Sequence, residues 1–246
     1  MKKIDRSRKR QFTILGILTG FFCLLVFWTK LWSWAFTKFF PSLDTVIYEM
    51  AGFPELVMEH IALVAVSSGL ATIIGLAAGI VVTRTWGRDF LPAVNALASM
   101  GQTFPPVAVL ALAVPVVGFG FKPTVIALFL YGLLPVIRNT IVGLESVSAD
   151  VLDAASGMGM TPGQVLTKVE LPLSAPVILA GVRISTVINI GTATLGATIG
   201  AGGLGKPIIA GLISDNPAFI LEGAILVGLF AIIVDTTLGL TVRDTP

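Results

Sequence analysis

Residues 148–172 read Ser-Ala-Asp-Val-Leu-Asp-Ala-Ala-Ser-Gly-Met-Gly-Met-Thr-Pro-Gly-Gln-Val-Leu-Thr-Lys-Val-Glu-Leu-Pro, a mixed stretch between two long apolar runs. Asp150 and Asp153 lie in the first turns of a predicted helix over about 150–158, where the helix dipole favours acids. Gly159 stands where a glycine commonly ends a helix. The first half of the stretch therefore predicts a short helix that stops at a sharp turn.

The second half of the stretch has the residue types of a new helix start. Thr161 is a good N-cap, Pro162 suits the first helical position, and Gln164 completes a capping box. We expect this second helix to end at Leu171-Pro172. From its spacing alone, the hairpin has two open interpretations. It is either a rigid knob held between two membrane helices or an amphipathic connector on the membrane surface.

The composition around this stretch is that of a membrane protein. The chain has 246 residues, of which 55% are hydrophobic and only 12% charged, and its mean hydropathy is +0.93. Soluble domains carry about 25% charged residues, and disordered chains have low hydrophobicity. Both classes are therefore excluded. The lone Cys23 cannot form an internal disulfide and indicates no redox compartment.

Six apolar runs are long enough to cross a bilayer, which takes about 20 helical residues each. The first is interpreted as a retained helix rather than a cleaved signal peptide, because no small-residue cleavage site follows it. The aromatic residues between positions 28 and 40 then predict a belt at the far interface. The third run contains three prolines. The predicted spans are Phe12–Trp28, Ile61–Thr83, Asn95–Val117, Pro123–Thr140, Val177–Gly200 and Phe219–Thr241.

The distribution of basic residues predicts a cytoplasmic N-terminus. With that orientation, twelve of the sixteen Lys and Arg lie inside, and four lie outside: Lys30, Lys38, Lys122 and Lys206. Without the first ten residues the bias is six against four, with the same sign. The basic start is accordingly interpreted as a membrane anchor rather than a nucleic-acid tail. Residues 148–172 then face the cytoplasm.

The segment resembles the EAA loop of ABC importer permeases, whose pattern is E-A-A, three residues, G, nine residues, I-x-L-P. Here the spacing is the same, with Asp in place of Glu and Val in place of Ile as the departures. The matching positions are Asp153, Ala154, Ala155, Gly159, Val169, Leu171 and Pro172.

This resemblance implies an all-α polytopic membrane protein with six transmembrane helices and the type I ABC importer permease fold. It implies a coupling loop that docks on separate ABC ATPase subunits, so that ATP is bound by the partner and this chain holds no cofactor. The implied partners also include a second permease subunit, predicted to be a different chain, an external substrate-binding protein and the lipid bilayer. The implied location is the bacterial plasma membrane.

Three further stretches resemble the osmoprotectant branch of that family, which imports glycine betaine, choline or carnitine. They are Gly101-Gln-Thr-Phe-Pro-Pro-Val-Ala-Val-Leu110, Leu134-Pro-Val-Ile-Arg-Asn-Thr140 and Gly191-Thr-Ala-Thr-Leu-Gly-Ala-Thr-Ile-Gly-Ala-Gly-Gly-Leu-Gly205. The last two are also similar to methionine-type permeases. We divide the chain into residues 1–55, with the basic start, first helix and outer loop, and a permease core over 56–241 that includes the coupling loop 148–172.

Two enzymatic interpretations are rejected. Gly200–Gly205 matches G-x-G-x-x-G and, with Lys206, nearly matches a Walker A loop, but Pro207 follows where a hydroxyl is needed. The stretch also follows a predicted membrane helix rather than a strand, so it fails the context test for a nucleotide site. We interpret it as a glycine-rich turn. His60 is the only histidine, so no histidine cluster exists for a metal, and we expect no catalytic residues.

Polar residues inside the spans are the candidates for a pathway. Ser185, Asn189 and Thr192 recur on one helical face of the fifth span. Such a face either packs against other helices or lines a water-filled path, and both interpretations stay open. Around the prolines of the third span, Gln102, Thr103 and Pro105 are the second set, because irregular backbone at membrane depth is buried or lines a cavity.

Three functions remain from the sequence. The first is the membrane permease of an ATP-driven osmoprotectant importer. The second keeps the architecture but imports methionine or another small solute. The third, from another class, is an ion-coupled carrier or a structural membrane protein, for which no ATPase partner is expected.

Overall fold

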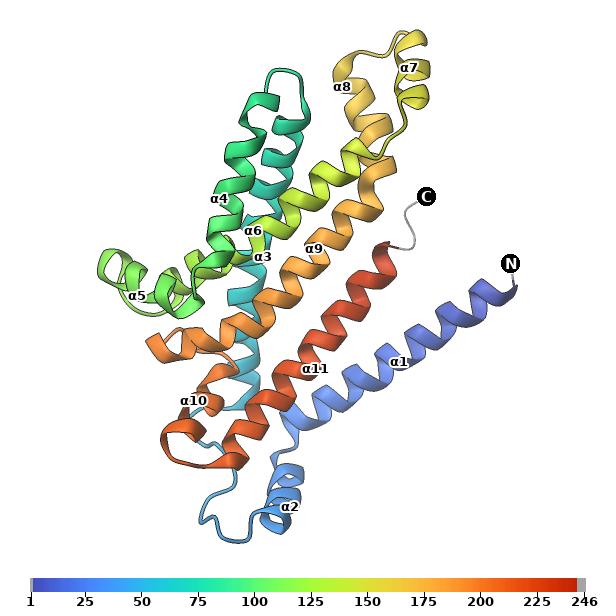
Figure 1. Cartoon of the computed structure of the whole chain (residues 1–246). Coiled ribbons are helices and arrows are strands. Elements are labelled where there is room, and N and C mark those ends of the chain that lie inside the picture. Colours follow the sequence, from blue (N-terminus) through green and yellow to red (C-terminus); the bar gives the residue numbers. More distant parts are fainter. Residues whose placement is uncertain (1, 243–246) are drawn as a thin grey trace. The chain divides into compact units, whose positions relative to one another are not determined.

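The computed structural model describes residues 2–242, and within them every regular element is a helix (Figure 1). The α-helices are α1 (Lys2–Phe27), α2 (Thr29–Phe39), α3 (Phe53–Thr83), α4 (Leu91–Thr103), α5 (Pro106–Val117), α6 (Phe121–Glu145), α7 (Ala149–Gly157), α8 (Pro162–Val165), α9 (Leu171–Ala193), α10 (Gly205–Ile213) and α11 (Pro217–Val242). Short 3-10 helices cover Arg88–Phe90 and Thr194–Ile199, and a π-helical turn covers Leu166–Glu170.

Five helical stretches of the described chain are long and apolar enough to cross a membrane. They are Lys9–Phe27, Phe53–Thr83, Phe121–Glu145, Pro162–Ile199 and Pro217–Thr241. Five of the six predicted spans therefore have counterparts. The ends at Thr83 and Thr241 are as predicted, and the other ends differ by between one and fifteen residues. The fifth run is longer than predicted because the helix begins at Pro162, within the loop of residues 148–172.

The predicted third span, 95–117, is not one helix. It is divided between α4 and α5, and the chain between them is extended at Phe104, with φ −73° and ψ 134°. Phe104 precedes Pro105, and the residue before a proline is disfavoured in helical conformation. The proline pair that sequence analysis singled out thus ends one helix and starts another. The twelve-residue α5 is shorter than a bilayer span.

The chain forms two compact units that alternate along the sequence. The first contains the chain up to Ala65, Pro106–Ile126 and Ile190–Thr237, and the second contains Val66–Pro105, Ala127–Asn189 and the chain from Leu238. In the first unit, Trp32 and Phe36 of α2 are buried, and Trp32 packs 6.2 Å from the ring of Phe53. The predicted aromatic belt is therefore wrong for these two residues, which belong to a core.

The second unit is built on close helix contacts between α3 and α6. A Cβ atom added at Gly75 would lie 2.9 Å from Val136, so the two helices approach each other at a distance that only a glycine permits. Val82, Leu134 and Ile137 are buried together in a core cluster of this unit. Small residues in lipid-embedded helices serve this kind of packing.

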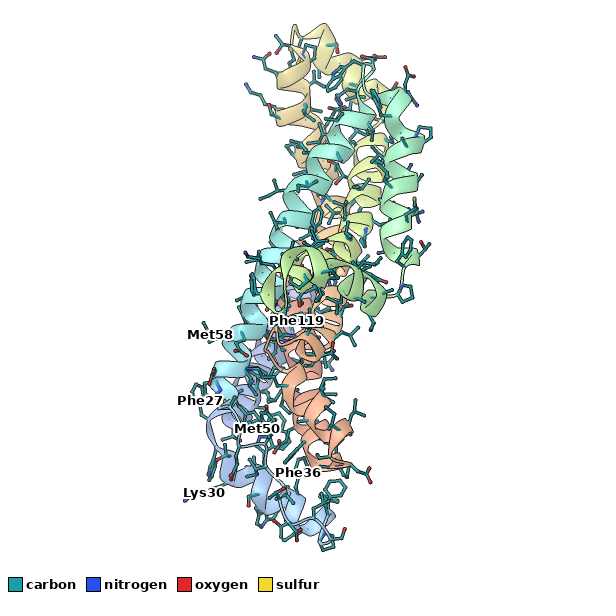
Figure 2. All side chains as sticks on the ribbon, turned by 90° about the vertical axis from the view of Figure 1, so that its left-hand side faces the viewer. Phe27, Lys30, Phe36, Met50, Met58 and Phe119 are labelled. Carbon is teal, nitrogen blue, oxygen red and sulfur yellow. The ribbon has the colours of Figure 1, made fainter. Side chains whose placement is uncertain are left out.

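The surface of the first unit carries large apolar side chains. Phe27, Met58 and Phe119 are 74%, 65% and 77% exposed, and Figure 2 shows Phe27 and Met58 projecting from the ribbon. A soluble protein rarely exposes so much apolar surface in one region. Side chains of this kind are stable when they face lipid, which agrees with the span assignment.

Candidate functional site

The loop of residues 148–172 begins with a helix, α7, that ends as predicted. After α7, Gly159 adopts a left-handed conformation with φ +81°. The Gly159 N–H donates to Ser156 O at 2.9 Å, and the Met160 N–H donates to Ala155 O at 3.2 Å. These two bonds form a Schellman motif, which satisfies the free carbonyls at a helix end. A residue with a Cβ is strained in this conformation, so Gly159 is required by the turn.

The second short helix begins with the predicted capping box. The Gln164 N–H donates to Thr161 Oγ1 at 3.4 Å, and the Thr161 N–H donates to Gln164 Oε1 at 2.8 Å. Both bonds join residues of the loop itself, three positions apart. Figure 1 shows α7 and α8 folded back on each other as a hairpin. Both interpretations of the hairpin, the rigid knob and the amphipathic connector, stay predictions.

The predicted end of the second helix at Leu171-Pro172 is wrong. The helix passes through a π-helical turn over Leu166–Glu170 and runs directly into α9. In this turn the Leu171 N–H donates to Leu166 O, five residues back. Pro172 is tolerated because its missing N–H falls where the hydrogen-bond ladder changes from π to α. The loop is therefore continuous with a membrane helix.

The matched residues of the loop divide into an outward and an inward set. Asp153, Ala154 and Gly159 are exposed, whereas Ala155 is buried. Near them, Met158 is 77% exposed, a large apolar residue that sequence analysis did not select. At the base of the hairpin, Val169 and Leu171 are half-buried and Pro172 is exposed. The hairpin thus presents an acid, small residues and an apolar side chain on one short helix.

An ion pair lies at the base of the hairpin. Arg84, the residue after α3, places Nη1 2.7 Å from Glu170 Oε2 and Nη2 3.2 Å from Glu170 Oε1. Arg84 Nη2 also donates to Thr83 Oγ1 at 3.1 Å. The pair borders a cavity of about 390 Å³, which Arg88 and Glu145 also line. Sequence analysis missed the pair because its members are 86 positions apart.

Two of the predicted pathway residues lie inside helix packing. Asn189 is fully buried and its Nδ2 donates to Ser67 Oγ at 3.3 Å and to Ser68 Oγ at 3.0 Å. Ser185 is also fully buried, and both side chains lie against Gly132, where a Cβ would collide with them. In this structure the predicted polar face of α9 meets α3 and α6, which corresponds to the packing alternative for these two residues.

The other predicted pathway residues are more accessible. Gln102 is half-buried, and its Nε2 donates to Tyr131 O at 2.9 Å, while the Tyr131 hydroxyl donates to Phe104 O. Thr103 and Pro105 are exposed, next to the extended backbone that separates α4 from α5. Thr192, in the first unit, is half-buried. Their part in a pathway stays a prediction.

The glycine-rich turn is held by an acid from α3. Glu59 Oε2 accepts the Gly203 N–H at 2.7 Å, and Glu59 also pairs with Lys206 Nζ at 3.1 Å. At Gly202, with φ +86°, an added Cβ would lie 2.6 Å from the Glu59 carboxyl carbon. This carboxylate therefore occupies the position in which a phosphate would meet the loop backbone, which is a third reason to reject a nucleotide site there.

The segment before α3 packs against α11. Tyr48 is buried, and its N–H donates to Glu222 Oε2 of α11 at 3.0 Å. Burial raises the pKa of the Tyr48 hydroxyl, the charge of Lys206 lowers it, and that of Glu59 raises it. The phenol is therefore protonated at neutral pH.

Comparison with known proteins identifies the family. The family of binding-protein-dependent transport system inner membrane components matches residues 71–244. The chain belongs to this family. Its members are permease components of ABC importers, so the chain is a multi-pass permease of the bacterial inner membrane and not itself an enzyme. The resemblance found in residues 148–172 is thereby confirmed at the level of the family.

Relatives of known function cover most of the permease. This chain is 41% identical to the osmoprotectant import permease protein OsmY of Salmonella typhimurium. The alignment spans 221 residues, which are 89% of this chain and 91% of OsmY. This chain is 40% identical to the choline transport system permease protein OpuBB of Bacillus subtilis, over 75% of this chain and 84% of that one. The similarity therefore covers three quarters or more of this chain in both comparisons.

A solved structure confirms the fold class. The inward-facing MetNI methionine ABC transporter superposes with a TM-score of 0.70, at 24% identity, over 78% of this chain and 94% of that chain. At this identity the likeness concerns the fold alone. The prediction of a type I ABC importer permease fold is confirmed.

Proposed function

We propose that the chain is the membrane-spanning permease of an ATP-driven importer of osmoprotectants, that is, glycine betaine or related quaternary amines. The observation that carries the proposal is the hairpin 148–172, a capped and rigid loop that is continuous with α9. Relatives near 40% identity that transport osmoprotectants or choline support the cargo. The alternative cargo, methionine, is supported by a likeness of fold alone.

In the proposed mechanism α7 docks on a separate ATPase subunit. Asp153, Ala154 and Met158 are the exposed residues that offer the contact, and the Schellman turn at Gly159 keeps α7 at a set angle to α8. ATP binding and hydrolysis take place on the partner, and this chain contributes no cofactor. Closure of two ATPases displaces the hairpin, and a rigid helix transmits that displacement better than a flexible loop.

The remaining partners follow from the same proposal. A second permease, a different chain, completes the pathway, and an external binding protein delivers the cargo and selects it. The N-terminus lies in the cytoplasm, in agreement with the excess of Lys and Arg on that side. Gln102, Thr103, Pro105 and Thr192 are the proposed pathway residues, since they are the more accessible of the polar candidates.

Uptake of labelled glycine betaine tests the cargo. Cells that contain the ATPase and the binding protein are compared with and without this chain, with unlabelled choline and methionine as competitors. We expect uptake to require the chain and choline to compete. Unchanged betaine uptake, with methionine transport dependent on the chain, would replace the cargo while leaving the permease assignment.

A pair of glycine variants tests the coupling role of the loop. Gly159→Ala adds one methyl group to a residue with φ +81°, which costs about 1–2 kcal/mol of strain in the turn. Gly157→Ala adds the same group within α7, where nothing lies within 4 Å. We expect reduced uptake in the first variant, with normal amounts in the membrane, and full uptake in the second. Equal uptake in both would contradict the coupling role.

A further inference from the structure

The base of the hairpin contains a buried acid that the proposed docking mechanism does not use. Glu170 occupies the unspecified position of the I-x-L-P pattern, yet it is only 6% exposed. Both of its carboxylate oxygens are bound by the guanidinium group of Arg84, at 2.7 and 3.2 Å. A two-pronged Arg–carboxylate contact sets the orientation of both groups as well as their distance.

The π-helical turn places Glu170 in this contact. Its extra residue rotates α8 relative to α9 by about one residue, roughly 100° of helix. The Ser174 hydroxyl donates to Glu170 O at 2.7 Å and so satisfies a carbonyl next to the irregular turn. Without the π turn, an uninterrupted α-helix would present a different face of α8 toward Arg84. We therefore infer that the ion pair depends on the π-helical turn.

Arg84 is equally constrained on its own side. Its backbone N–H donates to Val81 O at 3.2 Å, and its Nη2 donates to Thr83 Oγ1 at 3.1 Å. Thr83 Oγ1 in turn donates to Ile80 O at 2.8 Å. A cation at the C-terminal end of a helix is also favoured by the helix dipole. Glu170 is thus bound to an arginine whose own position at the end of α3 is fixed by these hydrogen bonds.

We propose that Arg84 and Glu170 are positioning residues that transmit displacement of the ATPase-docking hairpin into α3. Along the chain, the hairpin is connected only to α6 and α9. The ion pair adds a third connection, from the root of α8 to the end of α3. Because a buried ion pair contributes little net stability compared with apolar packing, we assign the importance of this pair to the orientation that it imposes on the two helices. This inference rests on the proposed coupling function.

The test uses the assembled transporter, with its ATPase and binding protein, in proteoliposomes. The readout is the amount of betaine imported per ATP hydrolysed. Glu170→Gln removes the charge with little change in volume, and the exchange Arg84→Glu with Glu170→Arg restores a pair. Arg88→Gln and Glu145→Gln are matched controls, because both residues are exposed and line the same cavity.

We expect Glu170→Gln to lower the ratio about tenfold while the ATPase still copurifies, and we expect the exchanged pair to restore part of it. The control variants keep the normal ratio. Arg84→Lys, a milder change that retains the charge, loses the two-pronged contact and lowers the ratio without lowering the amount of protein. This variant keeps the test decisive where Glu170→Gln fails to accumulate.

A normal ratio in both Glu170→Gln and Arg84→Lys would overturn the inference alone. A loss in Glu170→Gln that Arg84→Lys does not share and the exchange does not restore would also overturn it, because it would assign Glu170 a packing role. If the unaltered chain copurifies no ATPase, the proposed function fails, and this inference fails with it.

Discussion

One ion pair lies near each end of α3, and the two pairs differ in the groups that donate hydrogen bonds to the carboxylate. At the cytoplasmic end, as proposed, Glu170 is buried and both oxygens meet the fork of Arg84. At the other end, Glu59 is about one-third exposed and its shortest bond, at 2.7 Å, is to the backbone N–H of Gly203. Lys206 is a second contact of the same carboxylate, at 3.1 Å.

The difference indicates two uses of the same residue type. The Arg84–Glu170 pair joins two helices through side chains of defined geometry. Glu59 instead holds a glycine turn by its backbone, and Lys206 balances the charge. A lysine is a flexible point charge and sets no orientation, whereas an arginine does. We therefore expect the first pair to be sensitive to the identity of its cation and the second to be sensitive to the glycines.

The largest effect is expected for Gly202→Ala. Its φ of +86° is strained for a residue with a Cβ, which costs about 1–3 kcal/mol, and the methyl group would also displace the Glu59 carboxylate. We expect the Tm in mild detergent to fall by about 5–10 °C. Gly200→Ala is the control, because it shares the positive φ but nothing lies within 4 Å. An equal fall in both variants would contradict the role of Glu59.

Exchange of the two cations tests the difference directly. Arg84→Lys keeps the charge but loses one of two contacts to a buried acid, so we expect a loss of about 1–2 kcal/mol. Lys206→Arg should lie within about 0.5 kcal/mol of the original protein. Thermal unfolding of both variants in the same detergent measures this. A larger loss in Lys206→Arg would reverse the comparison.

Local signals in the sequence were sufficient for the spans and the hairpin. Apolar runs predict helices because lipid leaves no other way to satisfy the backbone, and five of the six runs were correct. The turn at Gly159 and the box at Thr161 and Gln164 were correct because their bonds join residues at most five positions apart.

Features that depend on distant partners could not be predicted in this way. Trp32 resembled an interfacial residue, but it is buried against Phe53 of another helix. The face of α9 that carries Asn189 was recognised, but not that Ser67 and Ser68 of α3 cover it. Pro172 was expected to end a helix, because a π turn leaves no recognisable pattern of residues.

The capping box offers a smaller, local effect. Thr161→Ala removes the acceptor for the Gln164 N–H, and an N-cap of this kind contributes about 1 kcal/mol. We expect hydrogen exchange over residues 161–166 to become about fivefold faster, with no change in Tm. Thr167→Ala is the control, because its hydroxyl only donates back to Gly163 O within the helix. Equal exchange in both variants would mean that packing, and not the cap, holds α8.

The smallest expected effect is the dependence of each pair's contribution to stability on salt concentration. The side chains of Lys206 and Glu59 are 30% and 33% exposed, whereas that of Glu170 is 8% exposed. Raising the salt from about 0.05 to about 0.5 M shortens the screening length severalfold. The exposed pair contributes under about 1 kcal/mol, so the small Tm difference between the original chain and Lys206→Gln should shrink with salt. The Tm difference for Arg84→Gln should persist. If both differences shrink alike, water and ions reach Glu170, and the pair could not act as a rigid connection between the hairpin and α3.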